Sequence, residues 1–317
     1  MRKNLILLLL VVGCFQMGAA NFTFRELVNL GDSCVQQYDY FHALQYYQNA
    51  QLLSNSLKLQ TKIADCYYNR LEYQKCADIL KKVGEDSLSH DAYREIVYSY
   101  RALKQPGSVS YWGENLIQRF PMDGEMTAVV MNNSCSDEIN QPQVAVEIGQ
   151  TYVKTDSTNL EVLRSLGNAY FLEQKYDSCK ITYHTLLNLG DTTANNYYYI
   201  GVCWEYQKNL KEAYTYYSRA VEVDQQKHPV FMYRLGVVAQ QLGKNEEAID
   251  MLEKAEEKYL PDKILMTIIY NHLAQAYFDS KEYDMALDTW RKSESDGTDP
   301  EIEKKIAATE KLIEKMK

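Results

Sequence analysis

The cysteines and histidines, which are the residues best suited to catalysis or metal binding, are scattered along this 317-residue chain. None of the five histidines belongs to an HExxH motif, which would place two metal ligands on one face of a helix. No GxSxG motif and no glycine-rich phosphate loop occurs. The sequence therefore predicts no catalytic site, no metal site and no cofactor, and we expect a protein that is not an enzyme.

Six cysteines follow the first 20 residues, and none of them forms a CxxC pair. They are Cys34, Cys66, Cys76, Cys135, Cys179 and Cys203. We expect them to be buried free thiols that pack as small apolar side chains. Disulfides remain an alternative if the chain is exported to an oxidising compartment, although the spacing indicates no framework.

Tyrosine is the more informative residue, because the chain has 27 of them. A tyrosine combines a large apolar ring with a hydroxyl group, which suits recognition of another protein. We expect about two thirds of them to pack between helices and the rest to form a binding surface.

Residues 160–255 come close to repeating themselves. A glycine preceded by a bulky apolar residue recurs at Gly167, Gly201 and Gly236, at intervals of 34 and 35 residues. A small residue stands twelve positions after each glycine, and an apolar residue nineteen positions after it. These residues are Cys179, Ala213 and Ala248, then Leu186, Ala220 and Ala255. Such a period is typical of stacked helical repeats.

Within each unit, apolar residues recur at helical spacing in two runs that are separated by a short polar break. Two antiparallel helices joined by so short a turn pack at about 8–10 Å between their axes. A glycine inside a helix costs roughly 0.5–1 kcal/mol relative to alanine. Its recurrence in register therefore indicates close contact between the two helices.

This pattern resembles the tetratricopeptide repeat. It is met again in LVNLGDSCVQQYDYFHALQYYQNA (residues 27–50) and in YNHLAQAYFDSKEYDMALDTWRKS (residues 270–293). The resemblance covers most of the chain. It implies an all-α fold, a superhelical solenoid of helix pairs with a C-terminal capping helix.

The resemblance also implies where a partner would bind. In this family the concave face is lined mainly by side chains from the first helix of each pair. The corresponding residues here are Arg164, Asn168, Phe171, Asn195, Tyr198, Glu205, Tyr206, Tyr233, Gln240, Asn271, Gln275 and Phe278. Some relatives clamp a peptide's terminal carboxylate, but Tyr199 stands where those relatives have Asn, and Val230 where they have a cation. We therefore do not expect a carboxylate clamp.

The N-terminal half follows the pattern less closely. Residues 24–123 are expected to form three helix pairs, of which the first is clear, with Pro106-Gly107 as the turn inside the third. Residues 124–159 fit least well, and we expect a degenerate repeat there, with a shortened first helix, a second helix at 144–153, and any joint in the solenoid. Residues 160–295 are the clear array.

Residues 299–317 are expected to form the capping helix, because terminal repeats need a polar outer face. Asp299 is the expected N-cap, and Pro300 occupies the first helical position. Eight helix pairs and one cap are expected in total.

Residues 1–20 resemble a secretory signal peptide. Arg2 and Lys3 precede an apolar run, and cleavage after Ala20 would follow small residues. The alternative is a lipoprotein signal in which Cys14 carries a lipid tether. The apolar run is too short to span a bilayer, which takes about 20 residues, so we expect no integral membrane protein. The expected location is the periplasm or the outer membrane of a Gram-negative bacterium.

Removing residues 1–20 takes away two basic residues, which changes the net charge from −9 to −11. An acidic chain repels phosphate backbones, so nucleic acid is not an expected partner. We expect a scaffold in the cell envelope that binds a protein or peptide segment on the concave face. The alternative is a solute- or glycan-binding component of an envelope nutrient-uptake assembly, for which Tyr198, Tyr206 and Tyr233 would form an exposed platform.

Overall fold

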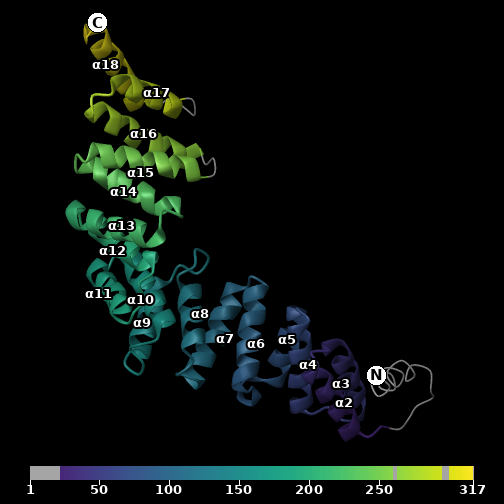
Figure 1. Ribbon diagram of the computed structural model, residues 1–317. Coiled ribbons are helices and arrows are strands. Elements are labelled where there is room, and N and C mark those ends of the chain that lie inside the picture. The colour runs from purple at the N-terminus through teal and green to yellow at the C-terminus, as the bar shows by residue number, and fades with distance from the viewer. Residues whose placement is uncertain (1–21, 260–262, 295–299, 317) are drawn as a thin grey trace, which may run out of the picture. The chain divides into compact units, whose positions relative to one another are not determined.

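The computed structural model describes residues 22–259, 263–294 and 300–316, and the regular structure in these ranges is entirely helical. The predicted all-α class is therefore confirmed. In the order of Figure 1, the first helices are α2 (Phe24–Gln36), α3 (Tyr40–Leu53), α4 (Leu57–Asn69), α5 (Tyr73–Val83), the 3-10 helix η1 (Glu85–Ser87), α6 (His90–Ala102), α7 (Pro106–Arg119) and α8 (Gly124–Ser134). They are followed by α9 (Pro142–Tyr152), α10 (Leu160–Leu172), α11 (Tyr176–Asn188), α12 (Ala194–Tyr206), α13 (Leu210–Asp224), α14 (Pro229–Gln241), α15 (Asn245–Lys258), α16 (Lys263–Asp279), α17 (Tyr283–Glu294) and α18 (Pro300–Met316).

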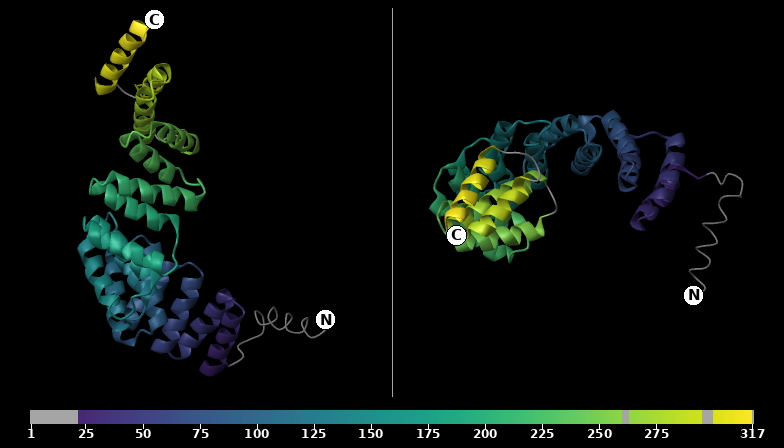
Figure 2. Two further views of the ribbon diagram at one scale, coloured as in Figure 1. Left: turned by 60° about the vertical axis from the view of Figure 1, so that its left-hand side comes forward. Right: turned by 90° about the horizontal axis from the view of Figure 1, so that it is seen from above.

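These helices belong to two compact units, residues 1–133 and residues 134–317, which we call unit 1 and unit 2. Within each unit, most helices pack mainly against the one before and the one after them in the chain. In Figure 2 the last helix, α18, is the yellow helix at the C-terminal end of unit 2. The boundary between the units falls within the segment 124–159, which contains α8 and α9. The expected signal peptide and the expected N-cap Asp299 lie outside the described residues.

The helices begin where the sequence offers a cap. The Thr23 side chain accepts a hydrogen bond from the Glu26 amide, and Glu26 in turn binds the Thr23 amide at 2.8 Å. Pro106 is the first residue of α7, so the expected turn at Pro106-Gly107 is wrong. Proline suits the first helical position because its fixed φ is already helical, and because an N–H group at this position would have no partner within the helix. The turn lies instead at residues 103–105, where Lys104 has the left-handed conformation.

The turns inside the helix pairs share one backbone geometry. One residue in each turn has a left-handed conformation, and in these turns it is Tyr38, Leu71, Lys104, Gln174, Lys208, Gly243 and Lys281. The next amide then donates to a carbonyl in the last turn of the first helix, as from Lys175 N to Tyr170 O at 2.8 Å. This bond satisfies a carbonyl at the helix end, so the chain reverses in two or three residues.

The repeated glycines lie where the two helices of a pair approach most closely. A Cβ atom at Gly167 would stand 2.8 Å from the ring of Tyr183, and one at Gly201 would stand 2.8 Å from the ring of Tyr217. At Gly236 the neighbour is Leu252, at 2.7 Å. The predicted close contact is present, and the group that fills it is a bulky side chain of the second helix.

Apolar side chains from neighbouring pairs form continuous cores within each unit. In unit 1, Ile96, Trp112 and Leu116 belong to one such cluster. At the end of unit 2, Ile302 and Ile306 of α18 pack into the cluster that contains Trp290. Among the described residues, no helix has both the length and the apolar character that crossing a membrane requires.

Candidate functional site

The twelve predicted binding residues all lie on the first helices of unit 2, namely α10, α12, α14 and α16. Arg164, Asn195 and Tyr206 are exposed, and the other nine are half-buried. None of the twelve is fully buried. We call the surface that carries them the first-helix face.

Tyr206 belongs to an aromatic group at the end of α12. Its ring stacks on Tyr176 at 5.3 Å between centroids and meets the edge of Phe171 at 5.7 Å. Tyr206 is 56% exposed, and the nearby Leu172 is 43% exposed. The group therefore offers a partly open apolar surface where the α10–α11 turn and the end of α12 lie together.

Tyr198 has different surroundings from Tyr206. Its ring lies 5.4 Å from Phe231 and 5.8 Å from Tyr217, and both of these residues are buried. Tyr198 and Tyr233 both pack against the core cluster that joins α12 to α15. They are thus partly core residues, and of the three tyrosines that were to form a platform only Tyr206 is exposed.

A charged pair lies on the same face between α12 and α14. Arg234 Nη1 is 3.4 Å from Glu205 Oε1, and the Tyr217 hydroxyl donates to Glu205 Oε2 at 2.5 Å. The Nε atom of Arg234 is buried and has no hydrogen-bond partner. Burial acts to lower the pKa of Arg234, but the charge of Glu205 and the adjacent tyrosines outweigh it, so this pKa lies above its ordinary value.

Other predicted residues are already held by neighbours. Arg164 Nε donates to Asp191 Oδ2 at 3.0 Å, and Gln275 donates to Asp279 at 2.9 Å. Gln240 Oε1 lies 3.3 Å from His272 Nδ1. Hence the polar part of the first-helix face is largely organised before any partner binds.

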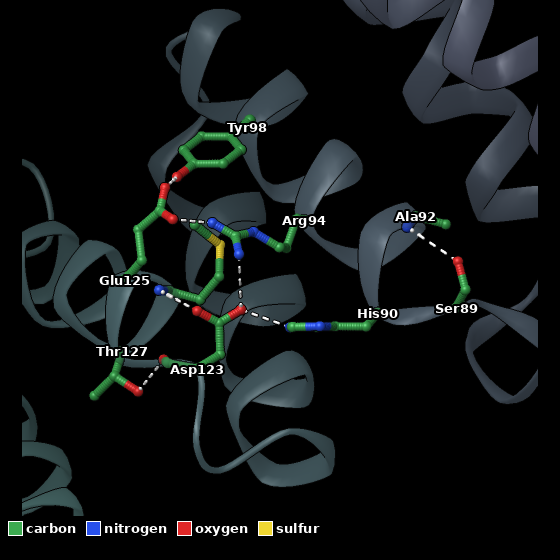
Figure 3. Close-up of polar contacts among 9 residues, drawn as sticks. Ser89, His90, Ala92, Arg94, Tyr98, Asp123, Glu125 and Thr127 are labelled. Carbon is green, nitrogen blue, oxygen red and sulfur yellow. Dashed lines mark hydrogen bonds and ion pairs between the residues drawn. The ribbon is translucent and has the colours of Figure 1, made fainter. Parts of the chain in front are cut away.

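A second polar group lies in unit 1, and the sequence did not predict it (Figure 3). Asp123, at the start of α8, is buried, and its Oδ2 atom is 2.6 Å from His90 Nε2 and 3.7 Å from Arg94 Nη1. Arg94 also contacts Glu125, which accepts a bond from the Tyr98 hydroxyl. At this point the sequence signals only a helix cap: Asp123 Oδ1 accepts a hydrogen bond from the Met126 amide, three residues later. A cap of this kind does not indicate which residues of α6 lie against Asp123.

This group borders an open pocket of about 500 Å³ lined by His90, Arg94, Arg119, Phe120, Pro121, Met122, Asp123 and Gly124. The charged side chains around the pocket form ion pairs with one another: Arg94 contacts Asp123 and Glu125, and Arg119 contacts Asp86. Side chains of opposite charge that already neutralise each other hold helices together and leave no net charge to attract an ion. We interpret the group as a contact between α6 and α8.

Several of these contacts follow one rule, which is that the first helix of one pair binds the first helix of the next. Lys62 and Asp32 are 30 residues apart in the chain, and their side chains are 2.6 Å apart. Arg94 and Glu125 are 31 residues apart, and Arg234 and Glu205 are 29 apart. We call these the inter-repeat contacts.

The cysteines are free thiols among the described residues. Cys66, Cys76, Cys179 and Cys203 are buried, and Cys34 and Cys135 are half-buried. Burial raises the pKa of the Cys66 and Cys76 thiols to about 12 each, which keeps them in the unreactive neutral form. In the part of the chain that the structure describes, no three His, Cys, Asp or Glu side chains are placed to hold a metal ion together.

Comparisons with known proteins agree with this architecture. Residues 230–257 match the family model described as tetratricopeptide repeat. The C-terminal part of a TPR repeat-containing protein from Cytophaga hutchinsonii is similar in structure, with a TM-score of 0.60 and 15% identity over 76% of this chain and 97% of that one. YrrB, a TPR protein with an unusual peptide-binding site, has a TM-score of 0.51 and 17% identity over 60% of this chain and 94% of its own.

No match to a curated protein was found. Identities this low show a shared fold and nothing about a shared partner. The helix pairs and their glycine-centred crossings therefore give this chain the all-α solenoid fold of the tetratricopeptide-repeat structures compared, and residues 230–257 match the tetratricopeptide repeat itself.

Proposed function

We propose that this protein is a non-enzymatic scaffold that binds a protein or peptide segment on the first-helix face of residues 160–295. The fold supports a binding role, because helix-pair solenoids expose long surfaces on a rigid framework. YrrB, which shares this fold, has a peptide-binding site. A location in the cell envelope rests on the resemblance of residues 1–20 to a signal peptide.

The exposed aromatic group around Tyr206 is the observation that carries the proposal. Tyr206 and Leu172 present open apolar surface, while Phe171 and Tyr176 hold the Tyr206 ring in place from behind. An aromatic ring already fixed by its neighbours loses little side-chain entropy on binding, which favours it as an anchor. Asn195 and Arg164 are also exposed on α12 and α10, towards the N-terminal ends of these helices.

The glycan-binding alternative required several exposed rings side by side. Tyr198 and Tyr233 instead pack against the core, so one exposed tyrosine remains of the three. This arrangement favours an apolar side chain of a protein partner over a flat sugar ring.

The test begins with photo-crosslinking in the full-length protein in its native envelope. A photoreactive amino acid replaces Tyr206 in one variant and Ile181 in the control variant, because Ile181 is 67% exposed on the second helix α11. We expect a protein to be captured through position 206 and not through position 181. Equal capture at both positions would argue against a specific first-helix face.

The captured protein is then purified, and its affinity for the unmodified chain, Tyr206→Ala and Ile181→Ala is measured. We expect Tyr206→Ala to weaken binding at least about fivefold, which corresponds to about 1 kcal/mol and is typical of an anchor residue. Ile181→Ala should bind as the unmodified chain does. Unchanged affinity for Tyr206→Ala would refute the proposed site.

A further inference from the structure

One inter-repeat contact in unit 1 joins two acidic side chains. Asp65 on α4 and Glu95 on α6 are both half-buried, and their carboxyl groups are hydrogen-bonded to each other. Two carboxylates have no proton to donate, so this bond requires one neutral carboxylic acid. Asn69 Nδ2 also donates to Asp65 Oδ1 at 2.8 Å, which favours the negative charge on Asp65 and the proton on Glu95. We call these two residues the carboxyl pair.

The inter-repeat contacts on either side of the carboxyl pair join opposite charges. One step earlier in the array, Lys62 binds Asp32 at 2.6 Å, and one step later Arg94 contacts Glu125. Both basic residues lie on the same two helices as the carboxyl pair and are engaged elsewhere. Among the described residues, no Lys or Arg forms an ion pair with either member of the carboxyl pair.

The groups that surround Glu95 do not neutralise it. From α4 it is faced by Cys66 and Tyr68 besides Asp65, from α5 by Cys76, and on its own helix by Asp91. The neighbouring α7 contributes apolar side chains to the core that α6 shares with it. At the start of α8, Asp123 and Glu125 are engaged by His90 and Arg94. The charge of Lys62 acts on Asp65 and favours its ionised form.

These surroundings explain how the carboxyl pair titrates. Burial, followed by the nearby charge of Asp65, raises the pKa of Glu95 to about 8. Burial also raises the pKa of Asp65, against the hydrogen bonds from Glu95 and Asn69 that lower it. Glu95 is therefore expected to lose its proton near neutral to mildly alkaline pH.

We propose that the carboxyl pair is a proton-controlled joint between the α4–α5 helix pair and the α6–α7 helix pair. With one proton shared, the hydrogen bond holds α4 and α6 together at this point. When the proton leaves, two carboxylates face each other in partly buried surroundings, and the joint loosens. This inference concerns unit 1 and is independent of the partner site proposed on unit 2.

The direction of the pH effect follows from proton binding. In the unfolded chain Glu95 titrates at its ordinary value of 4.5, so between this pH and about 8 the folded state holds more protons than the unfolded state. The stabilisation is fully present below the unfolded value. It falls as the pH rises through this window and is lost above the folded value.

The experiment compares the melting temperatures of the full-length protein and two variants from about pH 5 to about pH 9. Glu95→Gln keeps a donor for the Asp65 carboxylate but cannot titrate, and Glu114→Gln makes the same change at an exposed position on α7 as the matched control. We expect the melting temperature of the unmodified protein to fall by several degrees across this range. Glu95→Gln should flatten the fall in melting temperature and be the more stable protein at the alkaline end, whereas Glu114→Gln should show the same fall as the unmodified protein. An identical fall in Glu95→Gln would overturn the proposal.

A second measurement uses the unmodified protein and so does not depend on whether a variant folds. The side-chain carboxyl carbon of Glu95 is followed by NMR as the pH is raised, and we expect its midpoint well above the ordinary value. A midpoint at or below the ordinary value would contradict the proposal. Calcium ions added at alkaline pH provide one more control: if they restored the melting temperature lost on deprotonation, the pair would be a cation site and not a proton-controlled joint.

Discussion

At the residue scale, the repeated glycines show how one missing side chain positions two helices. Gly201 lies against the ring of Tyr217, whose hydroxyl group reaches Glu205 on the first helix of the same pair. The ring thus spans the helix pair and ends at the charged contact with Arg234. Close packing at a glycine and the polar arrangement of the first-helix face are therefore parts of the same contact.

Gly201→Leu should destabilise the protein, because a Cβ atom there would already stand 2.8 Å from the Tyr217 ring. We expect a loss of about 1–3 kcal/mol in the free energy of unfolding, measured by urea denaturation. Gly107→Ala is the control, because a Cβ atom at Gly107 meets nothing within 4 Å. If both variants unfolded at the same urea concentration as the unmodified protein, the crossing role of Gly201 would be wrong.

The tyrosines show why residue type alone does not identify a binding site. Tyr198 and Tyr206 lie on the same helix, yet one packs on Phe231 and the other is mostly exposed. The burial of each ring depends on whether a side chain of the following pair covers it. Tyr198→Ala would therefore cost stability, and Tyr206→Ala is the cleaner test of binding.

At the scale of the elements, the left-handed residue in each turn sets where a first helix ends. Glycine adopts this conformation without strain, whereas other residues pay about 1–2 kcal/mol. Gly243, with φ of +73°, is the glycine among the turns inside the helix pairs, and Leu71, with φ of +61°, is an exposed apolar residue in the same role.

Gly243→Ala should therefore destabilise the protein by about 1 kcal/mol through backbone strain alone, since the space around its Cβ position is open. Leu71→Gly should do the reverse and raise the melting temperature. Thermal denaturation followed by circular dichroism measures both changes. If Gly243→Ala stabilised the protein, the left-handed backbone at this position would not be the reason for glycine there.

At the scale of the whole molecule, each repeat is stabilised by its neighbours, and the last repeat of unit 2 is covered by α18. Ile302 and Ile306 pack with Trp290, and Lys305 Nζ lies 5.6 Å from the centre of the Trp290 ring. A terminal repeat without such a cover would leave apolar surface open to another copy of the chain.

Deleting residues 300–317 should lower the melting temperature and cause self-association, because the Trp290 cluster loses its cover. Deleting only residues 315–317 is the control, since Lys315 and Met316 are exposed. Size-exclusion chromatography with light scattering measures the association state. A monomer of unchanged stability after the larger deletion would rule out a capping role for α18.

Much of the helical pattern could be predicted from the sequence, because each helix pair is encoded by residues within one repeat. Caps such as Thr23, crossings such as Gly167 and proline starts such as Pro300 depend on spacings of a few residues. The expected turn at Pro106-Gly107 failed because proline also favours the first turn of a helix, and a short pattern fits both cases.

The sequence by itself determined that the chain is helical, that its helices come in pairs, and that tyrosine is abundant along them. The tertiary structure alone decided which tyrosines are exposed, which charges meet, and that Asp65 lies against Glu95. The physical reason is the distance along the chain: contacts such as Arg94 with Glu125 join residues 31 positions apart. Their geometry depends on how one repeat packs on the next, which no pattern within a single repeat specifies.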